Sequence, residues 1–168
     1  NELHWQATFK PAEKPGHVVV VGGGAAGCEA ARVAAMRGHK VTLLEQGKRL
    51  GGQLLIAARA PGRDSFEDQV YFEENALERL GVDVRLQTSA DVAFIKSLQP
   101  DAVVVATGAL PRMPDDVAGI DLPNVVQGWD VMLGKATTGQ RVALVSQEDY
   151  YQTPCVAEYL AAQGKEVE

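Results

Sequence analysis

The chain has 168 residues, 46% of them hydrophobic and 23% charged, which is the composition of an ordinary folded protein long enough for one domain and part of a second. Its formal net charge is −6 and it has no block of lysines or arginines, which speaks against a nucleic-acid partner. Its longest apolar runs are far shorter than the ~20 residues of a membrane-spanning helix and its polar N-terminus is unlike a signal peptide, so we expect a cytoplasmic protein without a membrane anchor.

The first predicted elements form one β-α-β unit. Residues 1–16 are a polar lead-in interrupted by prolines, and 18–21 are four consecutive valines, the pattern of a strand buried on both faces of a parallel sheet. Alanines at helical spacing predict a helix over 25–37, ended by Gly38. Residues 41–45 predict the next strand, and the two strands would be joined by a right-handed crossover.

Further helices and strands are predicted after a glycine-rich segment. Asp64 and Glu67 have the three-residue spacing of a capping box and predict the start of a helix that runs to about residue 80. Strands are expected at 82–86 and 102–106, with a short helix near 90–98 between them.

The chain then divides at a proline-containing segment. We predict a domain over 17–112, a linker over 113–140, and a second, incomplete unit over 141–168. That second unit would contain a strand at 141–146 and a helix at 154–163. One β-α-β opening cannot complete a parallel sheet, so the chain is expected to be a fragment of a longer protein. The predicted fold class is α/β: a doubly wound, Rossmann-like parallel sheet of the FAD/NAD(P)-binding type.

A G-x-G-x-x-G motif follows the first predicted strand directly. Gly22, Gly24 and Gly27 form it, and in this position they indicate a dinucleotide site: the first permits a tight turn, the second lets a pyrophosphate approach, and the third lets the helix pack closely on the strand. The helix N-terminus attracts the phosphates.

Glu45, at the end of the next strand, would accept hydrogen bonds from ribose hydroxyls and repel a 2′-phosphate, which argues against NADP.

Simpler interpretations exist for some of these residues. The glycines could serve a tight turn alone, although the strand, helix and acid around them make that reading the weaker one. Cys28 is better explained as a packing residue than as a nucleophile, because no histidine or second thiol lies near it in the sequence. Cys28 and Cys155 are the only cysteines and lie in separate predicted helices, so neither a metal site nor a redox pair is expected. We predict no catalytic residue in the chain.

Two further segments carry a resemblance to known enzymes. GKRLGGQL (47–54) and DAVVVATGALPR (101–112), taken with the glycine motif, resemble FAD domains of enzymes with two dinucleotide-binding domains. EAARVAAMRGHKVTLLEQGKRLGGQL and ATGALPRMPDDVAGIDLPNVV are similar to the C-terminal half of 2,4-dienoyl-CoA reductase, trimethylamine dehydrogenase and histamine dehydrogenase, the extended relatives of old yellow enzyme. The cofactor-binding residues that the motif and this resemblance imply are Gly22, Gly23, Gly24, Ala26, Gly27, Glu45, Gln46, Arg49, Gly52, Gln53, Thr107 and Gly108.

The resemblance implies several cofactors, and some of them would be held outside this chain. It implies FAD or ADP at the first turn, and an FMN-bearing barrel with a 4Fe-4S cluster in a preceding part of the polypeptide. The substrate site would then lie outside the chain. The expected partners are the remainder of the same polypeptide and a protein electron acceptor.

The second predicted turn lacks the glycines. Ser146, Glu148 and Tyr151 occupy roughly their places, and Glu148 with Asp149 would place negative charge against a phosphate. This resembles the degenerate second domain of trimethylamine and histamine dehydrogenases, and it favours an enzyme acting on an amine or N-methylated compound. An NAD(P)H-dependent reductase similar to dienoyl-CoA reductase, a structural ADP-binding domain, and a simple polar loop at this turn remain the alternatives.

Overall fold

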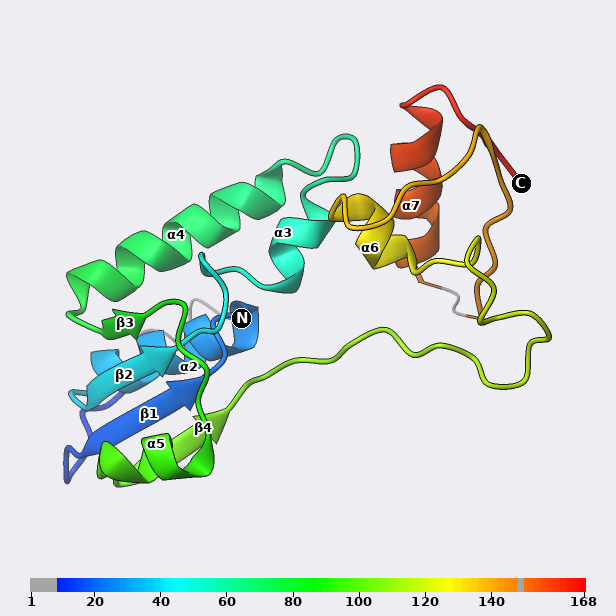
Figure 1. Ribbon diagram of the computed structural model, residues 1–168. Coiled ribbons are helices and arrows are strands. Elements are labelled where there is room, and N and C mark those ends of the chain that lie inside the picture. Colours follow the sequence, from blue (N-terminus) through cyan, green and yellow to red (C-terminus); the bar gives the residue numbers. More distant parts are fainter. Residues whose placement is uncertain (1–8, 148–149) are drawn as a thin grey trace. The chain divides into compact units, whose positions relative to one another are not determined.

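The protein folds as two compact units (Figure 1), and the computed structural model describes residues 9–147 and 150–168. The first unit contains the residues up to 54 and those from 67 to 108. The second contains residues 55–66 and 109–168. The short segment 55–66 therefore belongs to the second unit although the chain on both sides of it belongs to the first.

The first unit is built on a parallel sheet of four strands in the order β3-β2-β1-β4. Because β1 lies between β2 and β4, its residues Val19 and Val20 are fully buried, as the run of valines predicts. The predicted α/β fold with a parallel sheet is confirmed. The strands are β1 (His17–Val21), β2 (Lys40–Leu44), β3 (Asp83–Arg85) and β4 (Ala102–Val105).

Two helices, α2 and α4, contribute residues to the core beside this sheet, and α2 is the one that follows the glycine turn. Cys28 and Ala31 of α2 are buried in a core with Leu43 of β2 and Leu77 of α4. The helices in this part of the chain are α2 (Ala25–Met36), α3 (Gln53–Ala57), α4 (Ser65–Arg79) and α5 (Val92–Ser97), and most residues of α3 belong to the second unit. Three of them were predicted; α3 was not, because a five-residue helix is too short to show a periodic pattern.

The second unit has its own small core and a pair of parallel strands. Ala60, from the segment 55–66, is buried there, and Arg59 Nη1 donates to the Met132 carbonyl oxygen at 3.0 Å. The elements are α6 (Gly128–Met132), β5 (Arg141–Val142), α7 (Gln152–Ala161) and β6 (Glu166–Val167). The residues of the core are Ala60, Val131, Met132, Cys155, Val156 and Leu160.

Two expectations for the second unit need correction. The range 113–140, expected as a linker, contains α6, and Val131 and Met132 of that helix are buried because they pack in the core just described. The strand expected at 141–146 is only Arg141–Val142, because β6 is the one strand that pairs with it among the described residues. The domain boundaries themselves stay a prediction.

Two classes of feature are absent from the part of the chain that the structure describes. No helix there has the length and apolar character needed to cross a membrane. No group of histidine, cysteine, aspartate and glutamate side chains there is arranged to hold a metal ion.

Candidate functional site

The turn between β1 and α2 requires glycine at two of its three motif positions. Gly22 has a φ of +106°, a conformation that side-chain-bearing residues rarely adopt, and a Cβ on it would overlap the carbonyl oxygen of Ala106. A Cβ on Gly27 would overlap the carbonyl oxygen of Gly22. These two glycines are therefore explained by the packing of the chain on itself.

Gly24 is different, because nothing in the protein requires a glycine there. Its φ of −77° and ψ of 179° suit any residue, and a Cβ on it would have no atom within 4 Å. No side chain caps the N-terminus of α2 at this point, and the first turn of the helix contains no acidic residue. Among the described residues, the N-terminus of α2 thus has no side-chain cap, and the space beside Gly24 is open. A helix N-terminus of this kind, with its free amides and positive dipole end, can bind a phosphate.

The peptide groups around Gly23 connect three segments of the site. The Gly23 amide donates to Glu45 Oε2 at 2.6 Å, and its carbonyl oxygen accepts from the Gly51 amide at 2.8 Å and from the Cys28 thiol at 3.3 Å. The turn is thus held by the end of β2, by the second glycine segment and by α2. The sequence motif gives no sign of this role, because Gly23 is one of its variable positions.

Glu45 lies at the end of β2, where the motif predicts an acid. Besides its bond to Gly23, the carboxylate accepts from the Gly47 amide through Oε1 at 2.5 Å. Each carboxylate oxygen can accept two hydrogen bonds, so these two backbone bonds leave capacity for ribose hydroxyls. Binding of the ribose by Glu45 stays a prediction; the structure adds that Glu45 orients both glycine segments.

The second glycine segment lies directly against the first. Gly51 forms an isolated parallel bridge with Gly24. Gly52 has a φ of +51°, and a Cβ on it would lie 3.1 Å from the Cα of Gly24. Gln53 then begins α3. The backbone of this segment therefore forms one wall of the space in front of α2.

The residues that follow β4 lie close to both glycine segments. A Cβ on Gly22 would lie 3.2 Å from the Cα of Thr107, and a Cβ on Gly108 would lie 3.7 Å from Gln53 Nε2. β1 connects to β2 on one side and is paired with β4 on the other, so the site lies where the strand order reverses. Ligands of open parallel sheets bind at this kind of switch point.

Three of the implied site residues are not brought into these contacts. Ala26 and Gln46 are exposed, and neither contacts the glycine segments through a hydrogen bond shown in the structure. The guanidinium of Arg49 pairs with two acids of α4, at 3.3 Å from Glu74 Oε1 and 3.7 Å from Glu67 Oε2. Cofactor contacts of these three residues remain predictions.

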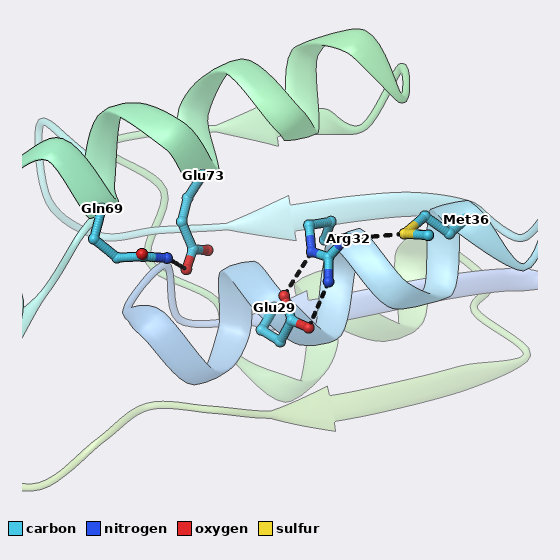
Figure 2. Close-up of polar contacts among 5 residues, drawn as sticks. All are labelled: Glu29, Arg32, Met36, Gln69 and Glu73. Atoms are coloured by element: carbon cyan, nitrogen blue, oxygen red, sulfur yellow. Dashed lines mark hydrogen bonds and ion pairs between the residues drawn. The ribbon is translucent and has the colours of Figure 1, made fainter. Parts of the chain in front are cut away.

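Two groups of polar contacts, one on α2 and one on α4, each contain a buried charged residue, Arg32 and Glu73 (Figure 2). Glu73 is 6% exposed, and burial is the main cause that raises the pKa of its carboxyl. Arg32, 9% exposed, donates to Glu29 at 2.6 and 2.8 Å. Burial, followed by the charge of Glu73, raises the pKa of the Cys28 thiol to about 12. A thiol with so high a pKa stays protonated at neutral pH, and the interpretation of Cys28 as a packing residue stays a prediction.

The raised pKa of Glu73 predicts a pH-dependent stability. Because the folded state favours the protonated carboxyl, the contribution of Glu73 to the free energy of unfolding is fully present below pH 4.5, the ordinary pKa, and is lost as pH rises through the folded-state pKa. Glu73→Gln should remove this decline and raise stability at pH 7 by on the order of 1 kcal/mol. Urea unfolding from pH 4 to pH 8 measures it, with Glu74→Gln as the partly exposed control on the same helix. An unchanged decline in Glu73→Gln would contradict the assignment.

The second turn is only partly described. Ser146 Oγ accepts from Thr153 Oγ1 at 2.7 Å, and Tyr151 precedes α7 with its ring 5.7 Å from the Arg63 guanidinium. Glu148 and Asp149, on which the predicted repulsion of a phosphate depends, lie outside the described residues. The interpretation of this turn as a degenerate nucleotide site therefore stays a prediction.

We compared the sequence with models of known protein families, and one model matches the region that contains the glycine turn. The model described as pyridine nucleotide-disulphide oxidoreductase matches residues 16–135, which includes the whole glycine turn and the end of β4. The chain belongs to this family. Cys28 and Cys155 are both free and buried in the structure.

Several known proteins are similar to this chain over nearly its whole length. N,N-dimethylglycine/sarcosine dehydrogenase of Chromohalobacter salexigens is 44% identical over 90% of the chain, and NADH oxidase of Thermoanaerobacter brockii is 41% identical over 95%. The solved structure of 2-naphthoyl-CoA reductase with 2-naphthoyl-CoA matches 95% of the chain with a TM-score of 0.89 and 35% identity.

These comparisons confirm the resemblance to the dienoyl-CoA reductase, trimethylamine dehydrogenase and histamine dehydrogenase group. The chain spans only 22%, 25% and 24% of the three proteins just described. It therefore corresponds to a part of larger oxidoreductases.

Proposed function

We propose that the chain binds FAD or ADP at the β1–α2 turn, as a domain of a larger flavin-dependent oxidoreductase. The observation that carries the proposal is Gly24, a glycine that the fold does not need, placed at an uncapped helix N-terminus with open space in front of it. A bound pyrophosphate would explain the glycine, because the absence of a side chain lets the phosphates approach the backbone.

The residues present fit an adenine dinucleotide. The amides of the first α2 turn and the backbone beside Gly52 would hold the pyrophosphate, while Glu45 would hold the adenosine ribose. Thr107 and Gly108 would lie along the remainder of the ligand. A bound FAD would supply electron transfer through its ring; these residues bind and orient it, and we assign no catalytic residue to the chain.

The proposal predicts selective adenine-nucleotide binding. ADP should bind the chain with measurable heat in a calorimetric titration, and 2′-phospho-ADP should bind at least about tenfold more weakly because the Glu45 carboxylate repels a phosphate at close range. Glu45→Gln, which keeps the size of the side chain, should reduce that difference. No heat at millimolar ADP contradicts the nucleotide site, whereas equal affinity for the two ligands contradicts only the role of Glu45.

For the whole protein we propose an oxidoreductase acting on an amine or N-methylated compound, located in the cytoplasm. The relative with 44% identity is a dehydrogenase of N,N-dimethylglycine and sarcosine, which supports this substrate class. FMN and a 4Fe-4S cluster would be held by a part of the protein outside this chain, and electrons would leave to a protein acceptor.

A reductase that uses NAD(P)H is the second candidate, favoured by the NADH oxidase and the 2-naphthoyl-CoA reductase among the similar proteins. We predict that NADH and NADPH do not rapidly reduce the full protein, because one carboxylate about 4 Å from a phosphate costs about 4 kcal/mol at an effective dielectric of ~20, roughly a thousandfold in affinity. Glu148 and Asp149 would supply that charge.

Anaerobic stopped-flow mixing of the oxidised full protein with each nucleotide measures this directly. Slow or absent bleaching of the flavin absorbance at sub-millimolar nucleotide is the expected result, and fast bleaching would establish the reductase instead. A full protein that carries ADP but no flavin at this site would favour the third alternative, a structural nucleotide.

A further inference from the structure

The turn that follows β3 contains a glutamine in a backbone conformation that normally belongs to glycine. Gln87 has a φ of +53°, in the left-handed region that is unfavourable for residues with a side chain. Among the non-glycine residues that the structure describes, only Gln99 also has a positive φ, of +49°. Gln99 follows α5, and its amide donates to the Lys96 carbonyl oxygen at 3.0 Å, so the end of a helix explains its conformation. Gln87 follows a strand, and no helix end accounts for it.

Backbone hydrogen bonds hold Gln87 in this conformation and connect it to the segment that carries Glu45. The Gln87 amide donates to the Gly47 carbonyl oxygen at 2.9 Å, and the Thr88 amide donates to the Glu45 carbonyl oxygen at 2.8 Å. The Glu45 amide donates in turn to the Arg85 carbonyl oxygen at 3.0 Å. The turn after β3 therefore lies directly beside the acid that we propose to hold the ribose.

The fold makes no use of the Gln87 side chain that the structure shows. This side chain is exposed, and it makes no hydrogen bond within the part of the chain that the structure describes. Glycine would adopt the same φ without strain, and asparagine would adopt it more readily than glutamine. A strained residue whose side chain the fold does not use points to a functional role of that side chain.

The strand order indicates what the Gln87 side chain can reach. The carboxyl ends of β3, β2, β1 and β4 lie in this order along one edge of the parallel sheet (Figure 1). In the proposed complex, Thr107 after β4 lies along the remainder of the ligand, the pyrophosphate lies at the turn after β1, and Glu45 after β2 holds the ribose. In the same direction, the base attached to that ribose extends toward the end of β3, where Gln87 lies.

We propose that the Gln87 side chain binds the base of the nucleotide and selects a purine with an exocyclic 6-amino group. The inference rests on the proposed nucleotide function. A glutamine amide has an acceptor oxygen and two donor hydrogens. Adenine has an amino donor beside a ring-nitrogen acceptor, so the amide and the base can form a pair of hydrogen bonds. The left-handed backbone at Gln87 fixes the direction in which the amide leaves the turn.

Two ligands that differ only in the 6-amino group test the assignment. In calorimetric titrations of the wild-type chain, ADP should bind about fivefold more tightly than purine riboside 5′-diphosphate, which lacks that group, because one hydrogen bond is lost. Gln87→Met keeps the length of the side chain and removes its amide, so the ratio of the two affinities should fall to about one. A wild-type chain that binds the two ligands equally well overturns the assignment.

A second pair of variants tests whether the left-handed glutamine serves the ligand or the fold. Gln87→Gly should melt at or above the wild-type temperature, because glycine suits a positive φ, and it should lose the preference for ADP. Gln99→Gly is the matched control: the φ at this position is also positive, and the variant should keep the preference. If Gln87→Gly melts well below both the wild type and Gln99→Gly, the side chain serves the fold and the proposal is overturned.

The possible failures are distinguishable. If neither diphosphate binds the wild-type chain at millimolar concentration, the proposed nucleotide function is wrong and the role of Gln87 is wrong with it. If both bind and the ratio is the same with and without the Gln87 amide, the nucleotide site stands and only the role of Gln87 is overturned. If the ratio falls in Gln46→Met and not in Gln87→Met, the amide next to Glu45 in the sequence binds the base instead.

Discussion

Gly24→Val abolishes adenine-nucleotide binding without destabilising the protein. The valine side chain would occupy the open space in front of α2, where a pyrophosphate must approach the backbone, and we expect affinity to fall at least about a hundredfold, or about 2.7 kcal/mol. The fold should tolerate it because the backbone at Gly24 is extended and no atom lies within 4 Å of the added Cβ. Calorimetric titration with ADP and a thermal melt measure the two effects.

Gly62→Ala is the comparison for that experiment. A Cβ there also meets no atom within 4 Å, but Gly62 lies outside the site and its φ is +70°, so this substitution should cost stability and leave binding unchanged. If Gly24→Val binds ADP as tightly as the wild type, the ligand does not approach this turn. If it melts far below the wild type, the valine is excluded by the fold and not by the ligand.

Gly27→Ala should destabilise the first unit strongly. Alanine normally stabilises a helix by about 1 kcal/mol relative to glycine, but here its Cβ would overlap the carbonyl oxygen of Gly22. Because the obstructing atom belongs to the backbone, α2 or the turn must shift, and we expect a net loss of about 3 kcal/mol. That loss corresponds to a Tm lower by roughly 12 °C or more.

Thermal unfolding followed by circular dichroism checks this result. Ala30→Gly, in the next turn of the same helix, measures the helix-propensity effect alone and should lower stability by only about 1 kcal/mol. A Gly27→Ala protein as stable as the wild type would show that α2 can move away from the turn, and it would contradict the packing role of Gly27.

Much of the first unit is predictable because its elements are long or strongly patterned. The run of valines in β1 strongly favours a strand, and the alanines of α2 strongly favour a helix. The structure places both elements within a residue of the expected bounds. The five-residue helices α3 and α6 were not foreseen, since a segment of that length shows no period. Their formation depends on tertiary packing, for example of Val131 and Met132 of α6, which the local sequence does not reveal.

The candidate site, too, is only partly predictable from the sequence. The motif predicts which glycines and which acid come together, because the ends of parallel strands meet at one edge of a sheet. It does not predict that Glu45 binds the Gly23 and Gly47 amides, nor that Cys28 donates to Gly23. Those bonds depend on side-chain directions. Similarly, Arg49 pairs with α4, a helix whose position relative to it is set only by the complete fold.

The path of residues 55–66 has a consequence for how the protein is made. This segment leaves the ribosome before β3 and β4, but the residues that pack on Ala60, such as Val131 and Val156, are synthesised much later. At about 5–20 residues per second, the segment waits several seconds for them. During that time the first unit has all its own strands available to pair, while Ile56 and Ala60 have no core to enter. Folding of the second unit is therefore completed only after α7 has been translated.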